Sequence, residues 1–257
     1  MEARSTTDSG ADRQGSTYDG VPAPELPAWI GAGRVHLYDV VGSTMDVAHA
    51  LAAGGAPDGT IVLADSQLAG RGRHGRPWRS TAGQGVWFTA IERPRDPAAV
   101  EVLSLRVGIA LADAIDPLAA SPVRLKWPND LYVAEGKLAG ILVEARWRDA
   151  RLDWVAIGIG LNVRPPELGG SLRPDVSRLE VLSRIVPALR DACRRPGSLT
   201  AEERTRFSMR DLAHGRVAVS PAAGTVAGID QSGALLIAGA DGVKPFRSGS
   251  LVFREET

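Results

Sequence analysis

The chain has 257 residues, which is enough for one sizeable hydrophobic core and a small second module. Lys plus Arg and Asp plus Glu each number 30, and this zero net charge argues against a dedicated nucleic-acid binder. One cysteine excludes an internal disulfide framework, and no stretch approaches the roughly 20 apolar residues of a membrane helix, so we expect a cytoplasmic protein that does not enter a membrane.

The first part of the chain, residues 1–28, is rich in Gly, Pro, Ser and Thr and lacks the apolar run of a signal peptide. Such a composition buries too little apolar surface to order a chain, so we expect a disordered tail over 1–28. Regular structure is expected to start near Trp29.

Strand and helix patterns alternate irregularly through residues 29–212, which predicts one α+β domain with a mixed sheet and flanking helices. Strands are predicted at 34–41, 60–64, 86–91, 123–126, 131–133, 137–146 and 154–159. Helices are predicted from Ser43 or Thr44 to the Gly54–Gly59 segment, and at 101–115, 177–193 and 201–212. Pro187 is expected to kink or interrupt the third helix, and Thr200 with Glu203 predicts a capping box at the start of the last.

The pattern changes after residue 212, where short alternating runs are separated by glycine-containing turns. The runs cover 216–220, 224–229, 234–238, 243–246 and 250–253. Short strands at this spacing predict a small β-barrel or sandwich over 213–257, so we expect a domain boundary near residue 213.

The most unusual segment is the Arg/Gly loop, residues 70–78, with the sequence Gly-Arg-Gly-Arg-His-Gly-Arg-Pro-Trp. Its glycines allow close approach to a ligand, and its three arginines supply forked donors that suit carboxylate or phosphate. Trp78 offers a flat surface on which a base can stack. We interpret the segment as a flexible cationic loop that closes over an anion, with a solvated turn or an RNA contact as the alternatives.

A second cluster, Lys-Trp-Pro-Asn-Asp at residues 126–130, lies where a predicted strand ends. Pro128 restricts its neighbour, and the turn presents Asn129 and Asp130 side by side. This pattern favours a site at the strand end, although a plain Pro-Asn-Asp turn is an equal alternative.

Two strands interrupted by glycine complete the set. Lys137 opens an apolar strand as a point charge suited to phosphate, and Gly140 within that strand indicates close approach of a ligand; an exposed strand-edge lysine is the alternative. Residues 158–163, Gly-Ile-Gly-Leu-Asn-Val, end another strand with one amide, Asn162. Metal-ligand spacing, a nucleophile elbow and a Walker loop are missing from the sequence, so any phosphate must be bound by the Arg/Gly loop and Lys137.

In this order and spacing the four segments resemble the biotin–protein ligase family, over roughly residues 34–164 and more weakly through the C-terminal module. The resemblance implies a class II aminoacyl-tRNA synthetase-like catalytic domain over 29–212 and an SH3-like β-barrel over 213–257. It also implies a ligase that forms biotinyl-5′-AMP from biotin and ATP, then transfers biotin to a lysine of a biotin carboxyl carrier domain. Mg²⁺ would arrive with the nucleotide, with Asp130 as a possible aid and no dedicated metal site.

The resemblance also implies which residues act. The implied biotin-binding residues are Ser43, Thr44, Met45, Gln67, Arg71, Gly72, Arg73, Lys137 and Gly140. The implied nucleotide-binding residues are Arg71, Arg73, Arg76, Trp78 and Asn162, with Trp78 stacking on adenine. The implied catalytic residues are Lys137 and Arg73, which stabilise the reacting groups, and Asn129 and Asp130, which orient and help deprotonate the incoming lysine.

This chain departs from the family pattern in two places. Met45 stands where family members usually have Asn, so an amide contact to biotin is lost or replaced. Some members carry an N-terminal DNA-binding module, and the roughly 30 irregular residues before the core predict a ligase that does not bind nucleic acid.

Three other functions are weighed against this one. A lipoate–protein ligase on the same fold is disfavoured by the Arg/Gly loop and the 126–130 cluster. A non-catalytic biotin-binding module is disfavoured because Lys137 and the loop arginines are kept, and RNA binding is disfavoured by the zero net charge. The sequence is compatible with a monomer or a homodimer.

Overall fold

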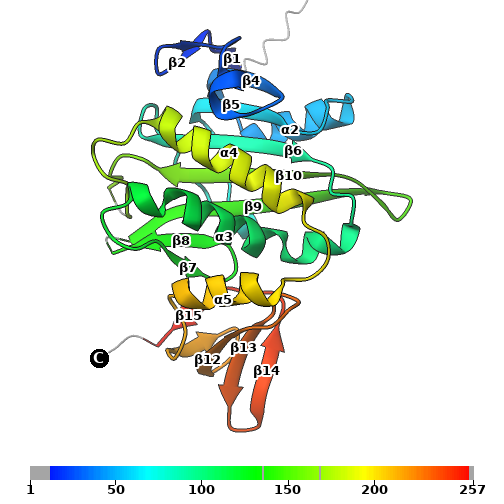
Figure 1. Cartoon of the computed structure of the whole chain (residues 1–257), viewed down its shortest axis with the longest axis vertical. Coiled ribbons are helices and arrows are strands. Elements are labelled where there is room, and N and C mark those ends of the chain that lie inside the picture. The colour runs from blue at the N-terminus through cyan, green and yellow to red at the C-terminus, as the bar shows by residue number, and fades with distance from the viewer. Residues whose placement is uncertain (1–11, 135, 168, 255–257) are drawn as a thin grey trace, which may run out of the picture.

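The structure is a computed structural model that describes residues 12–134, 136–167 and 169–254. In these residues the strands of a large sheet alternate irregularly with flanking helices, and a small second sheet formed by the last strands of the chain lies at one end of the molecule (Figure 1). The expected mixed sheet with flanking helices is confirmed.

The large sheet has eight strands in the hydrogen-bonded order β1-β4-β5-β6-β10-β9-β8-β7. Among its described pairs, β4 with β5 is parallel and the others are antiparallel, so the sheet is mixed. The strands are β1 Arg13–Gln14, β4 Arg34–Val41, β5 Thr60–Gln67, β6 Gly85–Glu92, β7 Arg124–Lys126, β8 Asp130–Val133, β9 Gly136–Arg148 and β10 Arg151–Asn162. Each predicted strand of this domain is therefore confirmed, with β5, β9 and β10 longer than expected.

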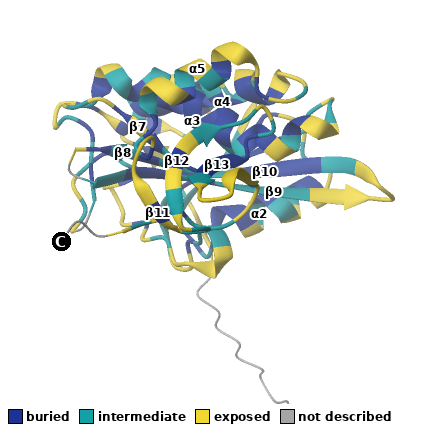
Figure 2. Cartoon of the chain, turned by 90° about the horizontal axis from the view of Figure 1, so that it is seen from below, coloured by how far each residue is buried: buried dark blue, intermediate teal, exposed yellow. Residues whose placement is uncertain are grey.

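Helices cover both faces of this sheet. Helix α2 (Thr44–Ala53) lies on one face, and α3 (Leu103–Ile115), α4 (Arg178–Arg194) and α5 (Ala201–Arg210) lie on the other, as Figure 2 shows. Apolar side chains between the sheet and α3 and α4 make up the main core, where each fully buried large residue contributes about 1.5–3 kcal/mol. The sheet therefore presents a rigid floor on which a site can be built.

Helix boundaries agree with expectation to within about one residue, except that α3 starts two residues late and α5 ends at Arg210, two residues early. Helix α3 starts at Leu103 because residues 97–102 wind as a short 3₁₀ helix, η2 (Pro97–Val102), whose N-cap Asp96 accepts from the Ala98 N–H. A further 3₁₀ turn, η3 (Asp116–Leu118), follows α3. The expected interruption at Pro187 does not occur, since α4 runs through it as one helix. The capping box of Thr200 and Glu203 at the start of α5 is confirmed.

The disordered tail expected over residues 1–28 is wrong for residues 12–28, while residues 1–11 lie outside the described part of the chain. Strand β1 joins the large sheet, β2 (Thr17–Tyr18) pairs with β3 (Val21–Pro22), and α1 spans Leu26–Ile30. Tyr18, Leu26 and Ile30 are buried, and Arg178 of α4 stacks on the Tyr18 ring while it pairs with Asp19. Burial of a few apolar side chains therefore stabilises this segment, although its average composition is polar.

The C-terminal module is an antiparallel sheet in the order β14-β13-β12-β11-β15. Its strands are β11 Val217–Ser220, β12 Gly224–Ile229, β13 Leu235–Gly239, β14 Gly242–Phe246 and β15 Val252–Phe253. The predicted strands are confirmed, and in the described residues their hydrogen-bonded order is open, with β14 and β15 at its two edges, so a closed barrel is not confirmed. Trp127 ties the two sheets together, because its indole N–H donates to the Gly233 carbonyl at 3.0 Å.

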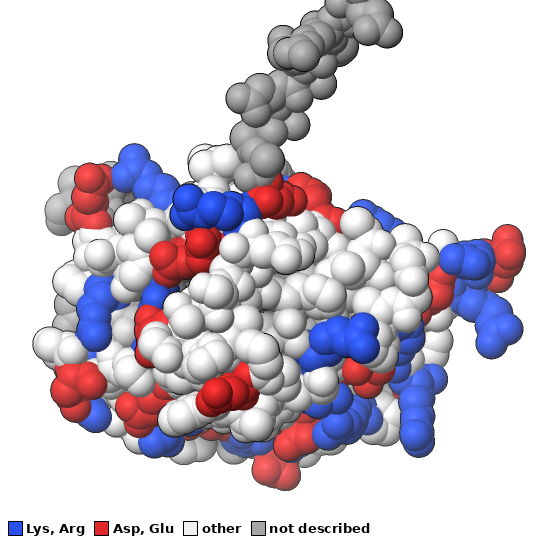
Figure 3. All heavy atoms as spheres, turned by 90° about the horizontal axis from the view of Figure 1, so that it is seen from above, with Lys and Arg blue, Asp and Glu red and all other residues white. Residues whose placement is uncertain are grey.

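The surface is mixed in charge. Acidic and basic side chains alternate around the face shown in Figure 3, with neutral residues between them. Every helix within the described ranges is too short or too polar to cross a membrane.

Candidate active site

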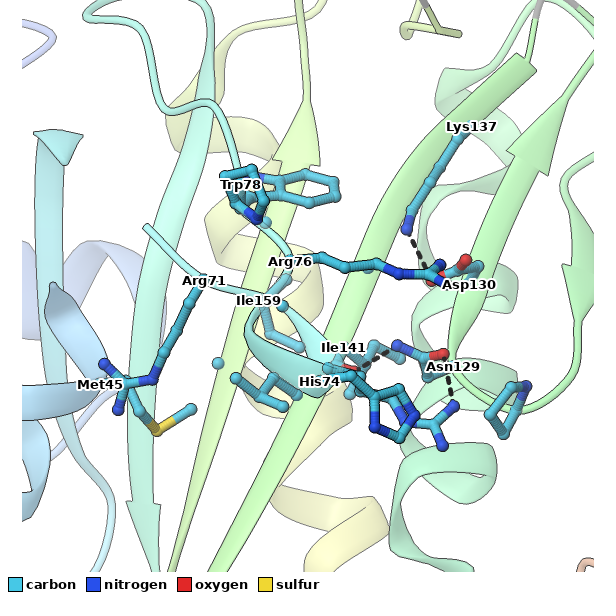
Figure 4. Close-up of a pocket in the computed structure, with 18 of the residues that line it drawn as sticks. Met45, Arg71, His74, Arg76, Trp78, Asn129, Asp130, Lys137, Ile141 and Ile159 are labelled. Carbon is cyan, nitrogen blue, oxygen red and sulfur yellow. Dashed lines mark hydrogen bonds and ion pairs between the residues drawn. The ribbon is translucent and has the colours of Figure 1, made fainter. Parts of the chain in front are cut away.

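A cavity of about 360 Å³ lies over the central strands β5, β6, β9 and β10 (Figure 4). This volume falls in the range of small-molecule sites. The start of α2, the Arg/Gly loop, the 126–130 cluster and the C-terminal module surround it. The lining residues are Ser43, Thr44, Met45, Gln67, Arg71, Gly72, Arg73, His74, Arg76, Pro77, Trp78, Phe88, Thr89, Lys126, Trp127, Pro128, Asn129, Asp130, Lys137, Gly140, Ile141, Leu142, Gly158, Ile159, Gly160, Ser250 and Leu251.

One end of the cavity carries uncharged hydrogen-bonding groups. The Thr44 N–H and hydroxyl both donate to the Gln67 side-chain oxygen, at 2.9 and 3.0 Å. The Gln67 amide nitrogen donates to the Ser80 hydroxyl at 2.7 Å, and the Thr44 and Thr89 hydroxyls lie 2.9 Å apart. Because each group is held by another, the amide and hydroxyls keep fixed directions toward the cavity.

Met45 lies beside this polar end and is 3% exposed. A Cβ on Gly158 of β10 would stand 2.9 Å from the Met45 methyl carbon. Real contacts are longer, so glycine at 158 is what leaves room for methionine at 45. The position that carries an amide in the resembled family is therefore filled here by a packed apolar side chain.

The Trp78 indole lines the cavity and lies against two glycines. A Cβ on Gly160 would stand 2.3 Å from Trp78 Cε2, and one on Gly140 would stand 3.2 Å from Trp78 Cζ3. These glycines are paired neighbours on β10 and β9, so together they form a flat seat for the ring. The Lys137 ammonium lies 5.2 Å from the ring centre on the same wall, within cation–π range.

The other end of the cavity is cationic. Lys137 Nζ lies 2.8 Å from Asp130 Oδ1, and Figure 4 shows the two side chains pointing toward one another. Arg73 donates to the Asn129 side-chain oxygen and to the Gly249 carbonyl, each at 3.4 Å. Asn129 in turn donates to the Ile141 carbonyl at 2.9 Å, which fixes its amide. These contacts join the Arg/Gly loop, the 126–130 cluster and the C-terminal module at one point.

Positive charge exceeds negative charge in the lining. Asp130 is the one carboxylate among the residues that line the cavity, against five Lys and Arg side chains. Burial lowers the pKa of the Lys126 ammonium, and the nearby Asp130 carboxylate opposes this shift. Within the described ranges no group of three or more His, Cys, Asp or Glu residues is arranged to hold a metal ion. The cavity thus offers a binding surface for an anion.

The Arg/Gly loop has a definite shape. The Gly72 N–H donates to the Arg76 carbonyl at 2.7 Å, and the Trp78 N–H donates to the Gly70 carbonyl at 2.8 Å. Between them lies the 3₁₀ turn η1 (Arg73–Gly75), in which His74 has φ 56°. A Cβ on Gly70 would meet the Trp78 carbonyl oxygen at 2.6 Å, so this glycine is required by close approach of the two sides of the loop.

The structure brings nearly all of the predicted site residues to one cavity. Those that line it are Ser43, Thr44, Met45, Gln67, Arg71, Gly72, Arg73, Arg76, Trp78, Asn129, Asp130, Lys137 and Gly140. Asn162 is not among the lining residues; its amide donates to the Lys137 and Gly170 carbonyls, both at 3.3 Å. In this geometry Asn162 supports the backbone beside Lys137, and its contact with a nucleotide stays a prediction.

Several lining residues were not predicted. The sequence pattern could have identified Thr89 and Gly160. Thr89 interrupts an apolar strand, and Gly160 lies two residues after Gly158, on the same face of the strand. Ser250 and Leu251 carried no such signal, because they reach the cavity only through the way the C-terminal module docks.

Comparison with known proteins agrees with this geometry. Residues 37–162 match the sequence model described as the Biotin/lipoate A/B protein ligase family. The chain is 43% identical over 127 residues to the bifunctional ligase/repressor BirA of Bacillus subtilis, covering 49% of this chain and 39% of that protein. It is 40% identical over 161 residues to the biotin–[acetyl-CoA-carboxylase] ligase of Mycobacterium tuberculosis, covering 58% of each. The matches therefore span less than two thirds of these relatives.

Similarity to solved structures extends further along the chain. The biotin protein ligase of Aquifex aeolicus in complex with biotin and ATP superposes with a TM-score of 0.69 at 27% identity, covering 87% of this chain and 100% of that one. The biotin protein ligase of Leishmania major in complex with biotinyl-5-AMP gives 0.58 at 26% identity, covering 83% and 98%. Residues 37–162 of this chain are thus similar to the Biotin/lipoate A/B protein ligase family, and the similarity to solved biotin protein ligases extends over most of the chain.

Proposed function

We propose that the chain is a biotin–protein ligase that makes biotinyl-5′-AMP from biotin and ATP and then transfers biotin to a lysine of a carrier protein. One observation carries the proposal: a single cavity joins an end with the hydroxyl and amide groups of Ser43, Thr44 and Gln67, where Arg71 is the one cation, to an end where Lys137, Arg73 and Arg76 gather. Biotin has a neutral ureido ring at one end and a carboxylate at the other, so its polarity matches that of the cavity.

The ureido group pairs with the hydroxyl and amide groups of the first end in this proposal. A ureido ring has two N–H donors and one carbonyl acceptor, and Ser43, Thr44 and Gln67 present hydroxyl and amide groups there. The apolar bicycle then lies against Met45 and the glycines of β9 and β10. Met45 supplies apolar contact in place of an amide hydrogen bond.

The first chemical step takes place at the cationic end. The biotin carboxylate attacks the α-phosphorus of ATP, the new O–P bond forms, and pyrophosphate leaves. Lys137 has three N–H donors, so it can keep its contact with Asp130 while it donates to the phosphate oxygens, where negative charge grows. Arg73 and Arg76 add forked donors for the phosphates, and magnesium would enter bound to the nucleotide.

The second step needs an uncharged lysine amine. The amine attacks the acyl carbon of the mixed anhydride, a C–N bond forms, AMP leaves with the electrons of the broken C–O bond, and the amine loses a proton. Asp130 and Asn129 line the cavity with their oxygens near Lys137 and Arg73, which suits Asn129 to orient the amine and Asp130 to accept that proton. The partner we propose is a biotin carboxyl carrier domain.

The C-terminal module completes the cavity in this proposal. Ser250 and Leu251 line the cavity and the Gly249 carbonyl accepts from Arg73, so the module holds the Arg/Gly loop in place. We assign residues up to 212 to the catalytic domain and 213–257 to this module, with an SH3-like arrangement as its proposed fold.

A lipoate ligase is the nearest alternative, and one assay separates the two. Biotin-dependent exchange of labelled pyrophosphate into ATP is measured first, followed by transfer of labelled biotin to a carrier domain. We expect exchange with biotin and none above background with lipoate. Exchange with lipoate but not with biotin would refute the proposal.

A further inference from the structure

Three side chains outside the cavity form a hydrogen-bonded chain that leads to the Arg/Gly loop. His49 of α2 lies between Trp154 of β10 and Glu144 of β9. The Trp154 indole nitrogen is 3.0 Å from His49 Nδ1, and His49 Nε2 is 2.9 Å from Glu144 Oε2. The His49 side chain is 13% exposed and Trp154 is buried, so water has little access to these bonds.

The direction of each bond follows from the chemistry of the groups. An indole N–H can only donate, so His49 Nδ1 must be the acceptor and carry no proton. The proton of a neutral imidazole is then on Nε2, which donates to the Glu144 carboxylate. A proton on Nδ1 would face the indole N–H, and burial also lowers the pKa of His49 despite the Glu144 contact. Trp154 therefore selects one tautomer of His49.

Glu144 connects this chain to the site. Its other oxygen, Oε1, lies 3.6 Å from Arg71 Nε, while Arg71 Nη1 lies 2.7 Å from Asp46 Oδ1. Arg146 also approaches Glu144, at 3.5 Å. Arg71 lines the cavity and in Figure 4 its side chain extends toward Met45. The direction of the Arg71 guanidinium thus depends on where the Glu144 carboxylate is held.

We propose that His49 is a positioning residue: fixed by Trp154, it holds Glu144 so that Arg71 points into the cavity for ligand binding. The inference rests on the proposed function, because it assigns the ligand of Arg71 to biotin and its adenylate. Asp46 is 65% exposed and holds Arg71 from the solvent side, whereas Glu144 holds it from the protein interior. Without His49, Glu144 is no longer held in place, and Arg71 keeps only its contact with the exposed Asp46.

The activity test uses His49→Phe, which keeps a flat apolar ring without a donor, and His49→Gln, whose amide can still donate to Glu144. His36→Phe is the matched control, since His36 is a half-buried histidine on β4 that does not line the cavity. For His49→Phe we expect the KM for biotin to rise about 10-fold with kcat within about twofold, as for loss of one charge-assisted hydrogen bond. His49→Gln should restore KM to within about threefold, and His36→Phe should match wild type. Wild-type KM in His49→Phe would overturn the proposal.

A second measurement is independent of activity. In protein labelled with ¹⁵N-histidine and ¹⁵N-arginine, we expect His49 to show a protonated Nε2 and an unprotonated Nδ1 at pH 7.5. The Arg71 Nε–H should exchange with water faster in His49→Phe than in wild type or His49→Gln. A protonated Nδ1, or unchanged Arg71 exchange in His49→Phe, would overturn the positioning role. Absence of biotin-dependent exchange in wild type would instead refute the proposed function, and the NMR result would still decide the chain from Trp154 to Arg71.

Discussion

Substituting Gly160 by alanine tests the seat on which the Trp78 indole lies. The added methyl would stand 2.3 Å from Trp78 Cε2 and 2.4 Å from its Nε1, far inside van der Waals contact. Gly160 itself cannot retreat, because β10 is hydrogen-bonded to β6 on one side and to β9 on the other. The ring must therefore leave its seat.

The loss of ligand binding in Gly160→Ala can be estimated from the cost of overpacking a protein core. Inserting a methyl into a filled site costs about 1–3 kcal/mol, which corresponds to about 5- to 150-fold if all of it is lost from ligand binding. Gly140→Ala should have a smaller effect, since its methyl would meet Trp78 Cζ3 at 3.2 Å. Gly239→Ala is the control, since its nearest neighbour is the Ala223 carbonyl oxygen at 3.7 Å, outside the cavity.

Steady-state pyrophosphate exchange at varied ATP gives kcat/KM for each variant, and thermal unfolding reports stability. We expect Gly239→Ala to keep the wild-type kcat/KM, Gly140→Ala to lose some of it and Gly160→Ala to lose most. Melting temperatures should stay close to wild type, because rotation of the Trp78 side chain relieves the clash. In a Trp78→Ala background, Gly160→Ala should change kcat/KM by less than about twofold, because the clashing ring is gone.

Two results would refute this reasoning. Equal kcat/KM for Gly160→Ala and wild type would mean that the indole does not need its seat. Additive losses in the double variant with Trp78→Ala would mean that the two positions act independently.

The remaining predictions concern the cationic end and one buried ion pair. Lys137→Ala should lower the rate of adenylate formation by about 10²–10³-fold without unfolding, measured by single-turnover pyrophosphate release. Arg73→Ala removes the contacts to Asn129 and to the Gly249 carbonyl, so bound adenylate should escape faster in a filter-retention assay. Arg106→Leu should destabilise the fold by about 3–5 kcal/mol in urea unfolding, because buried Glu203 loses its buried partner and keeps only the half-exposed Arg195 at 3.6 Å. Burial raises the pKa of Glu203, but the hydrogen bonds from Arg106 and Thr200 and the charges of Arg106 and Arg195 together outweigh it and lower the pKa from 4.5. The stabilisation is therefore present above pH 4.5 and is lost as pH falls through the lowered value.

Each of these has an outcome that would contradict it. Wild-type rates in Lys137→Ala would remove that lysine from the chemistry, and equal adenylate lifetimes in Arg73→Ala and wild type would remove the loop-closing role. For the ion pair, Glu203→Gln should lose less stability than wild type as the pH falls below 4.5. Parallel acid unfolding curves would show that Glu203 does not carry that pH dependence.

Much of this fold follows from local sequence patterns. Alternation and helical spacing depend on which face of an element is buried, so they were sufficient for the strands and for helices α2, α4 and α5. The Arg/Gly loop and the 126–130 cluster were also recognisable from sequence, because glycine and proline restrict the backbone locally and charged groups indicate their ligands. The segment at 12–28 was missed, since three buried anchors are diluted in a polar stretch.

The sequence by itself determined the elements, the cationic loop and the family resemblance. Only the tertiary structure decided which distant residues are in contact. The Met45 methyl fills the space left by Gly158, Trp78 lies on Gly160, and Ser250 and Leu251 line the cavity. The tertiary structure also turned Asn162 toward the backbone and linked His49 to the Arg/Gly loop. These contacts join residues far apart in the chain, so they depend on strand register and on how the C-terminal module docks, which no local pattern encodes.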